Sequence, residues 1–346
     1  MLPSSGAWLK AESTLTTGAP ILEVQDLHKR YALRRGLLNR QQAVIRAVDG
    51  VSLEARRGET LAIVGESGCG KSTLARLMLR LEEPTSGQVR FEGQDLLKLS
   101  GSGLRHARGN FQMVYQDPYS SLNPRMRIGQ ILAEALLVHG ICPRSTVMEH
   151  VHQLLNQVEL PALVATRHPA HLSGGQRQRV VIARALAVRP RIIVADEPVS
   201  ALDVSVQAQI LNLMQDLKRE VEVTWVFISH NLGVVRQVSE RVAVMYLGRI
   251  VEEAPADRIF AHPLHPYTKA LLASVPEPEP RRQMAAPPLI GDPPTATNIP
   301  PGCRFQQRCP LARPYCLAHD PSLVEMEQQH RVACWAVSAP GQWEQT

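Results

Sequence analysis

One short segment has the residue types and spacing that phosphate binding requires. Residues 65–72 read GESGCGKS, which fits the pattern G-x-x-x-x-G-K-[ST]. The glycines let backbone N–H groups converge on phosphate oxygens, Lys71 supplies a full positive charge, and the Ser72 hydroxyl is placed to bind Mg²⁺. The alternative is a chance Gly-rich turn, but the segment follows a predicted strand and precedes a predicted helix, as phosphate binding by such a loop requires. Cys69 occupies a variable position of the pattern and is assigned no catalytic role. The predicted phosphate-binding residues are Gly65, Ser67, Gly68, Gly70, Lys71, Ser72 and Thr73.

Two adjacent acidic residues follow a short apolar run farther along the chain. Residues 191–197 read RIIVADE, so Asp196 and Glu197 come at the carboxyl end of a predicted buried strand. In a parallel sheet, this is the edge where ligands bind. We expect Asp196 to hold Mg²⁺ through its water shell and Glu197 to polarise an attacking water as general base. Taken alone, the pair has a simpler explanation, because many strands end in solvated acids.

The apolar pattern around these motifs predicts an α/β fold. Compact apolar runs indicate buried parallel strands at residues 60–64, 192–195 and 225–228. Helical spacing is found at residues 72–80, 128–138, 147–158 and 205–220. Short β-rich runs indicate antiparallel strands at residues 22–31, 44–48 and 51–54. The expected architecture is a P-loop α/β core with an antiparallel β-subdomain and a helical insertion.

Length and composition exclude several classes of protein. The chain has 346 residues, of which 44% are hydrophobic and 20% charged, and this excludes a wholly disordered chain, a collagen-like repeat and a coiled-coil rod. The net charge of +6 fits a mildly basic soluble surface, although a membrane surface, nucleic acid or anionic ligands are alternatives. No stretch approaches the roughly 18–20 apolar residues of a membrane span, and the first 20 residues lack a signal-peptide pattern. We therefore expect a cytosolic chain.

Changes in composition predict the domain boundaries. Residues 1–19 are rich in Ser, Thr and Gly without periodicity, which is typical of a flexible tail. Nine prolines between residues 275 and 302 favour an extended linker. We predict a core domain over residues 20–257, with a helical insertion at about 118–180, and a separate C-terminal extension over residues 258–346.

Four of the six cysteines are concentrated in the last 44 residues: Cys303, Cys309, Cys316 and Cys334. Their spacings of five, six and seventeen residues match neither paired CxxC zinc motifs nor the ferredoxin pattern. Structural disulfides are not expected in a reducing cytosol. Four thiolates could hold a [4Fe-4S] cluster or Zn²⁺ and thereby stabilise a short module, and free thiols are the third alternative.

The segment Leu172–Gln176 reads LSGGQ, and with it the order of motifs resembles the ATPase subunits of ATP-binding-cassette (ABC) transporters over residues 21–254. The resemblance implies that Tyr31 stacks on adenine. It further implies that Gln116 senses the γ-phosphate and the membrane subunit and helps to bind Mg²⁺. It also implies that Asp203 joins two ATP sites and that His230 contacts the γ-phosphate. Without the resemblance, Tyr31 could equally be a half-buried strand residue, Gln116 a polar residue at a strand end, and His230 a hydrogen-bonded surface histidine. The signature residues, which would close on ATP held by an opposite subunit, are Ser173, Gly174, Gly175 and Gln176.

In this family, two ATPase chains enclose ATP and Mg²⁺ head to tail. The sequence has one set of motifs, so the resemblance implies a second ATPase chain, and we expect a paralogue rather than an identical copy. It further implies two membrane permease subunits and, indirectly, a substrate-binding protein. The expected location is the cytoplasmic face of the inner membrane, without nucleic acid as a partner.

The segment 260–276 reads FAHPLHPYTKALLASVP. Its trio His265, Pro266 and Tyr267 resembles the C-terminal extension of dipeptide and oligopeptide importer ATPases, although a capped helix start also explains Pro266. The wider match is closest to the second ATPase subunit of dipeptide importers. Because this extension is associated with an iron–sulfur cluster in some members, the resemblance favours a [4Fe-4S] cluster at the four late cysteines.

The predicted function is ATP hydrolysis that energises import of dipeptides or oligopeptides. Related importers of nickel, glutathione or haem precursors are the nearest alternative, since a motor subunit does not touch the cargo. A soluble cassette ATPase acting on nucleic acid is disfavoured because the sequence has no tandem cassette and no long coiled-coil insertion.

Overall fold

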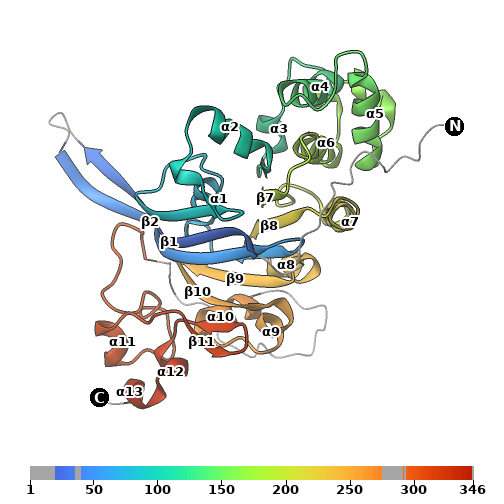
Figure 1. The fold of residues 1–346 in the computed structure, drawn as a ribbon. Coiled ribbons are helices and arrows are strands. Elements are labelled where there is room, and N and C mark those ends of the chain that lie inside the picture. The colour runs from blue at the N-terminus through green and yellow to red at the C-terminus, as the bar shows by residue number, and fades with distance from the viewer. Residues whose placement is uncertain (1–19, 36–39, 275–290, 292–293, 345–346) are drawn as a thin grey trace. The chain divides into compact units, whose positions relative to one another are not determined.

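The computed structural model describes residues 20–35, 40–274, 291 and 294–344 (Figure 1). They group into two compact units. The first unit comprises residues 56–59 and 98–227, and the second comprises the described parts of residues 20–55, 60–97 and 228–346. The predicted tail at 1–19 and most of the predicted linker lie outside the described residues.

The first unit contains parallel strands and a group of helices. Strand β6 (Phe111–Val114) runs parallel to β7 (Ile192–Asp196), and β8 (Thr224–Ser229), which ends just past this unit, is the next strand beyond β7. Both β7 and β8 are buried along their whole length, as expected for strands covered on both faces. The helices are α2 (Gly101–Gly109), α3 (Pro118–Ser121), α4 (Ile128–Val138), α5 (Val147–Gln157), α6 (Gly174–Leu186) and α7 (Val204–Val221), with short 3₁₀ turns at Ala162–Thr166 and Pro169–His171. Figure 1 shows α4, α5 and α6 grouped together in the region of the predicted insertion.

The second unit contains two sheets. In the first, the strand order is β2 (Arg40–Arg56), β1 (Pro20–Arg35), β4 (Ser86–Phe91) and β5 (Gln94–Asp95), with β1 antiparallel to β4. In the second, the order is β11 (Val324–Glu327), β12 (His330–Val332), β10 (Arg249–Pro255), β9 (Arg241–Tyr246) and β3 (Thr60–Val64). Strands β3 and β9 are parallel, whereas β9, β10, β12 and β11 pair antiparallel.

Among the described residues of the second unit, seven helices accompany these sheets. They are α1 (Lys71–Met78), α8 (Leu232–Val238), α9 (Ala256–Ala261), α10 (Pro266–Ala273), α11 (Pro314–Ala318), α12 (Trp335–Ser338) and α13 (Pro340–Glu344), and a 3₁₀ turn spans Leu96–Lys98. No helix in the described ranges is both long and apolar enough to cross a membrane.

The elements predicted around the motifs are confirmed with one difference. The runs at 44–48 and 51–54 belong to one strand, β2, rather than two. The reason lies at Asp49, whose N–H donates to the Gly248 carbonyl at 2.9 Å and whose buried carboxylate accepts from Arg304 at 2.5 Å. These contacts keep β2 continuous past Gly50, which has φ 82°, so the chain does not turn back there.

The C-terminal residues, predicted from composition as a separate extension, pair with a strand of the core sheet. Strand β12 adds to the edge of β10, with Val332 opposite Glu252, and therefore extends the sheet that contains β3. The fully buried Glu252 carboxylate strengthens this connection, because it lies 2.8 Å from His330 Nε2 and accepts the backbone N–H of His265 at 3.0 Å. Composition gave no sign of this pairing because β12 has only three residues.

Candidate nucleotide-binding site

The phosphate loop connects β3 to α1 in the second unit. Gly65 has φ 154° and Gly70, the residue before α1, has φ 112°. A Cβ atom on Gly65 would fall against the carbonyl oxygen of Met245, and one on Gly70 against that of Ala47. The loop therefore lies directly on the backbone of β9 and β2 at positions that only glycine can occupy. A loop of this shape followed by a helix N-terminus fits a polyphosphate ligand.

Lys71 is buried at the base of this loop. Its Nζ donates to the carbonyl oxygens of Gly65 at 2.7 Å and Glu66 at 2.9 Å, and it lies 3.8 Å from Cys69 Sγ. Burial raises the pKa of the Cys69 thiol, although the nearby ammonium opposes this shift. Cys69 is accordingly a protonated packing residue at neutral pH.

Tyr31 and His230 also belong to the second unit. The Tyr31 hydroxyl is hydrogen-bonded with Glu82 and Thr73, and burial together with Glu82 raises its pKa. Since Thr73 is in the first turn of α1, the structure brings Tyr31 beside the phosphate loop. His230 follows the last residue of β8 and is exposed, and Asn231 behind it caps α8 by accepting the Gly233 N–H at 2.9 Å.

In the first unit, the ends of neighbouring strands bring two predicted site residues together. Gln116 follows β6, Glu197 follows β7, and the Gln116 Nε2 donates to Glu197 Oε2 at 3.1 Å. Asp196 is the buried last residue of β7. Glu197 has φ 48°, an unfavourable left-handed conformation for a residue other than glycine. Its carbonyl accepts the Ser200 hydroxyl at 3.0 Å, which helps to fix this backbone conformation.

The LSGGQ segment begins helix α6 in the same unit. Ser173 Oγ accepts the Gln176 N–H at 3.3 Å, and Gln176 Oε1 accepts the Ser173 N–H at 3.1 Å, so the two residues form a capping box. A Cβ on Gly175 would lie 2.5 Å from Val206 Cγ1, and one on Gly174 would lie 3.1 Å from a Leu202 methyl carbon. The glycines thus let the segment around Asp203, the residue before α7, pack against the start of α6. Ser173 itself is exposed.

The trio in the C-terminal segment has a clear local structure. His265 Nδ1 accepts the Tyr267 N–H at 3.0 Å, Pro266 occupies the first turn of α10, and the capped-helix explanation of Pro266 therefore holds. Burial lowers the pKa of His265 to about 3, so the ring is neutral at physiological pH. Tyr267 has a further contact that the sequence did not indicate, because its hydroxyl oxygen accepts the Glu66 N–H of the phosphate loop at 2.9 Å.

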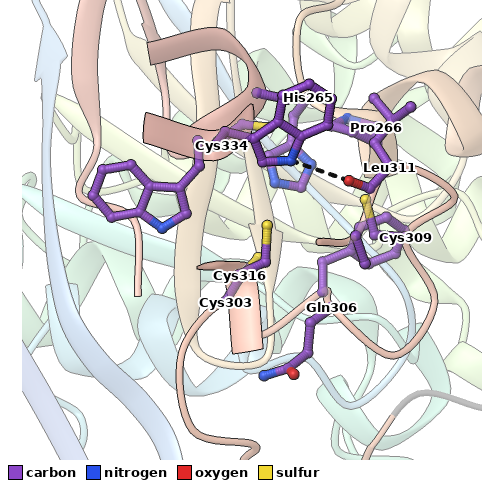
Figure 2. A pocket seen from close by; sticks show the side chains of 13 residues that line it. His265, Pro266, Cys303, Gln306, Cys309, Leu311, Cys316 and Cys334 are labelled. Carbon is purple, nitrogen blue, oxygen red and sulfur yellow. Dashed lines mark hydrogen bonds between the residues drawn. The ribbon is translucent and has the colours of Figure 1, made fainter. Parts of the chain in front are cut away.

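The four late cysteines line one pocket. Figure 2 shows Cys303, Cys309, Cys316 and Cys334 around it, together with His265 and Leu311. Burial raises the pKa of Cys303 to about 12 and that of Cys309 to about 11, and the neighbouring thiols add to both shifts. All six cysteines of the chain are described, and none of them forms a disulfide. Within the described residues, no three His, Cys, Asp or Glu side chains are grouped closely enough to share a single metal ion.

Sequence reasoning missed one charged residue at the phosphate loop. Arg308 pairs with the Glu66 carboxylate through two hydrogen bonds, at 2.7 and 2.9 Å. No motif includes Arg308, and 242 residues separate it from Glu66. Only the resemblance of the trio at 265–267 indicated that the C-terminal segment belongs with the ATPase.

Two families of known proteins match this chain. The family described as "ABC transporter" matches residues 48–200, which include the phosphate loop, the LSGGQ segment, Asp196 and Glu197. A dimeric structure of the ATP-binding cassette MJ0796 in a post-hydrolysis state with ADP and Pi is 30% identical, with a TM-score of 0.60, and covers 68% of this chain and 98% of that chain. The structure of cbiO1 from Clostridium perfringens, at 26% identity and a TM-score of 0.61, covers 70% of this chain and 91% of that chain. Fold and site together define an ATPase of the ABC class.

A second family, described as "Oligopeptide/dipeptide transporter, C-terminal region", matches residues 251–316. A probable peptide ABC transporter ATP-binding protein of Sinorhizobium fredii is 52% identical over 91% of this chain and 89% of its own length. The oligopeptide transport ATP-binding protein AppF of Bacillus subtilis is 49% identical over 91% of this chain and 96% of its own. The di/tripeptide transport ATP-binding protein DppF of Pseudomonas aeruginosa is 48% identical over 91% and 97%. The chain therefore belongs to the ATP-binding proteins of peptide ABC transporters.

Proposed function

We propose that this chain hydrolyses ATP to energise import of dipeptides or oligopeptides through a membrane transporter. The observation that carries the proposal is the presence, in one chain, of a glycine-shaped phosphate loop and of the peptide-transporter C-terminal region at residues 251–316. The three transport proteins named above each match 91% of this chain and are named for peptides, oligopeptides or di- and tripeptides, which supports peptides over nickel, glutathione or haem precursors as cargo.

The assigned residues have separate roles in ATP hydrolysis: phosphate binding, Mg²⁺ binding and activation of the attacking water. The loop glycines and Lys71 bind the phosphates of ATP, while Ser72, Gln116 and Asp196 hold Mg²⁺ directly or through water. When bound there, Mg²⁺ would supply positive charge that offsets the charge on the transferred phosphoryl group. Glu197 orients and polarises the attacking water, and its hydrogen bond with Gln116 supports this role because it fixes the carboxylate beside a second polar side chain. Tyr31 stacks on adenine, and His230 donates toward the γ-phosphate.

A complete site requires a second ATPase chain. Ser173 is exposed at the N-terminus of a 13-residue helix, where backbone N–H groups and the helix dipole favour an anion. We propose that Ser173, Gly174, Gly175 and Gln176 close on ATP held by a paralogous partner, and that Asp203 connects the two sites. Closure by ATP and reopening after hydrolysis then drive two permease subunits at the cytoplasmic face of the inner membrane, and a binding protein delivers the peptide.

We further propose that the cysteine pocket holds a [4Fe-4S] cluster. A single zinc ion needs four ligands within about 2.3 Å of one point, and the described cysteines are not grouped that closely. A cluster is larger and takes one thiolate at each iron, which suits four cysteines spread around one pocket.

Reconstitution tests the transport function. The chain, its companion ATPase and the permeases are placed in vesicles with the binding protein, and ATP hydrolysis is measured with and without a dipeptide. We expect the peptide to raise turnover several-fold, whereas stimulation by nickel or glutathione but not by peptide would contradict the proposed cargo.

The cluster has its own test. Protein purified without oxygen should absorb near 400 nm and contain about four irons per chain. Colourless protein without iron, or stoichiometric zinc, would contradict the cluster without affecting the ATPase assignment.

A further inference from the structure

Glu66, the second residue of the phosphate loop, is held by the C-terminal segment through both its backbone and its side chain. Its N–H donates to the Tyr267 hydroxyl oxygen at 2.9 Å, and its carboxylate accepts two hydrogen bonds from Arg308, at 2.7 and 2.9 Å. The Glu66 carbonyl accepts the Lys71 ammonium at 2.9 Å. Three polar groups of this residue thus link the lysine that binds phosphate to the C-terminal segment.

The groups that hold Glu66 are themselves fixed by packing. The Arg308 side chain is 4% exposed, and Tyr267 is fully buried. The Tyr267 ring packs against Tyr246 and Phe305, with ring centroids 4.6 and 5.5 Å apart. The Arg308 N–H donates to the Phe305 carbonyl at 3.0 Å, which closes the turn that carries the guanidinium. Neither donor can swing freely away from the loop.

Two physical effects follow at the nucleotide site. A guanidinium that forms two parallel bonds fixes both the position and the orientation of a carboxylate, and here it fixes the loop that must present N–H groups to phosphate. It also offsets the negative charge of Glu66, which would otherwise repel the phosphates of ATP. The Tyr267 hydroxyl satisfies a backbone donor that would be costly to leave unpaired.

We infer that Tyr267 and Arg308 are positioning residues of the ATP site, through which the C-terminal region sets the affinity of the phosphate loop for nucleotide. They act through Glu66 and do not touch the nucleotide. This inference rests on ATP binding at residues 65–72, as proposed above. The peptide-transporter C-terminal region is thereby part of the nucleotide site's support.

A double-mutant cycle on the full chain tests the role of Arg308. The variants are Arg308→Gln, Glu66→Gln and the two combined, and the measurement is the Kd of a fluorescent ATP analogue with Mg²⁺, checked by competition with ATP. Arg308→Gln leaves the Glu66 charge uncompensated, so we expect about tenfold weaker binding. In the Glu66→Gln background the same change should alter Kd less than about twofold, because no charge remains to be offset.

A matched control separates this role from general destabilisation. Arg258→Gln removes an arginine of the same unit that pairs with Glu327 at 3.4 Å on the surface, and it should leave Kd unchanged. Tyr267→Phe removes one oxygen atom only and should weaken nucleotide binding several-fold. If Arg308→Gln does not fold, Arg308→Lys takes its place, since it keeps the charge but loses the paired hydrogen bonds.

The outcomes distinguish the inference from the proposed function. Failure of the wild-type chain to bind the analogue would refute the assigned ATP site. Tight binding by the wild type, with Arg308→Gln and Tyr267→Phe both within about twofold of it, would overturn the positioning role alone. An equal loss for Arg308→Gln in both Glu66 backgrounds would also overturn it, because the effect would not pass through Glu66.

Discussion

The closest backbone approach in the phosphate loop gives a sharp prediction for Gly70→Ala. Gly70 has φ 112°, and an added Cβ would strike the Ala47 carbonyl oxygen and come within 2.9 Å of Met245 Cε. Positive φ costs a residue with a Cβ roughly 1–2 kcal/mol, and overpacking against a fixed neighbour costs about 1–3 kcal/mol more. We expect a loss of about 3 kcal/mol, which corresponds to a thermal midpoint lowered by roughly 4 °C for a chain of 346 residues, together with loss of ATP binding.

Gly93→Ala is the matched control for this substitution. Gly93 has φ 79°, and nothing lies within 4 Å of its Cβ position, so it suffers the backbone strain without the clash. Its cost should be about 1–2 kcal/mol with nucleotide binding intact. The assay is thermal unfolding followed by titration with the fluorescent ATP analogue. If Gly70→Ala had the same thermal midpoint as Gly93→Ala and bound nucleotide as tightly as the wild type, the packing of the loop on β2 would be refuted.

Three further predictions follow from the site and the C-terminal segment. Glu197→Gln should keep the Kd for ATP but lower ATP turnover at least about 100-fold, whereas Lys71→Ala should weaken ATP binding itself. Turnover is measured by phosphate release, and fast turnover by Glu197→Gln would show that Glu197 is not the general base. Burial lowers the pKa of folded His265 to about 3, so the folded chain binds fewer protons than the unfolded chain below pH 6.5, and stability is lost as pH falls from 6.5 toward 3. His265→Asn keeps an acceptor for the Tyr267 N–H but has no titrating ring. Between pH 6 and 4, its free energy of unfolding, measured by denaturant titration, should fall less steeply than that of the wild type, by about 1.4 kcal/mol per pH unit. Equal slopes for the two proteins would contradict the buried neutral ring. Cys309→Ser should lose iron and the absorbance near 400 nm, whereas Cys142→Ser should keep both. Because Cys309 follows Arg308 directly, Cys309→Ser should also weaken ATP binding. Equal iron contents in the two variants would refute Cys309 as a cluster ligand.

Most of the ATPase core was predictable because its motifs are local in sequence. Residues 65–72 are contiguous, and the flanking strand and helix follow from apolar spacing alone, so β3, the loop and α1 were correctly placed. The capping box of Ser173 and Gln176 is equally local. Strand β2 was divided in the prediction because Asp49 and Gly50 resemble a turn, and only Arg304, 255 residues away, shows why none forms.

The C-terminal segment was less predictable because its contacts are distant in sequence. Its prolines and cysteines indicated a separate module, yet three residues of β12 pair with β10, and Arg308 reaches the phosphate loop. A single arginine has no periodicity and no motif, and its partner Glu66 occupies a variable position of the phosphate-binding pattern. Pairings of this kind depend on tertiary structure.

The central claim is that this chain holds half of an ATP site and that closing the site on a second ATPase chain moves a transporter. The most direct measurement compares ATP turnover per chain for the dilute, isolated monomer and for the chain assembled with its companion ATPase and permeases. We predict slow turnover for the monomer, at least tenfold faster turnover in the assembly, and loss of this gain when Ser173 of the chain is replaced by arginine. Full turnover by the solitary monomer, unchanged on assembly, would contradict the account.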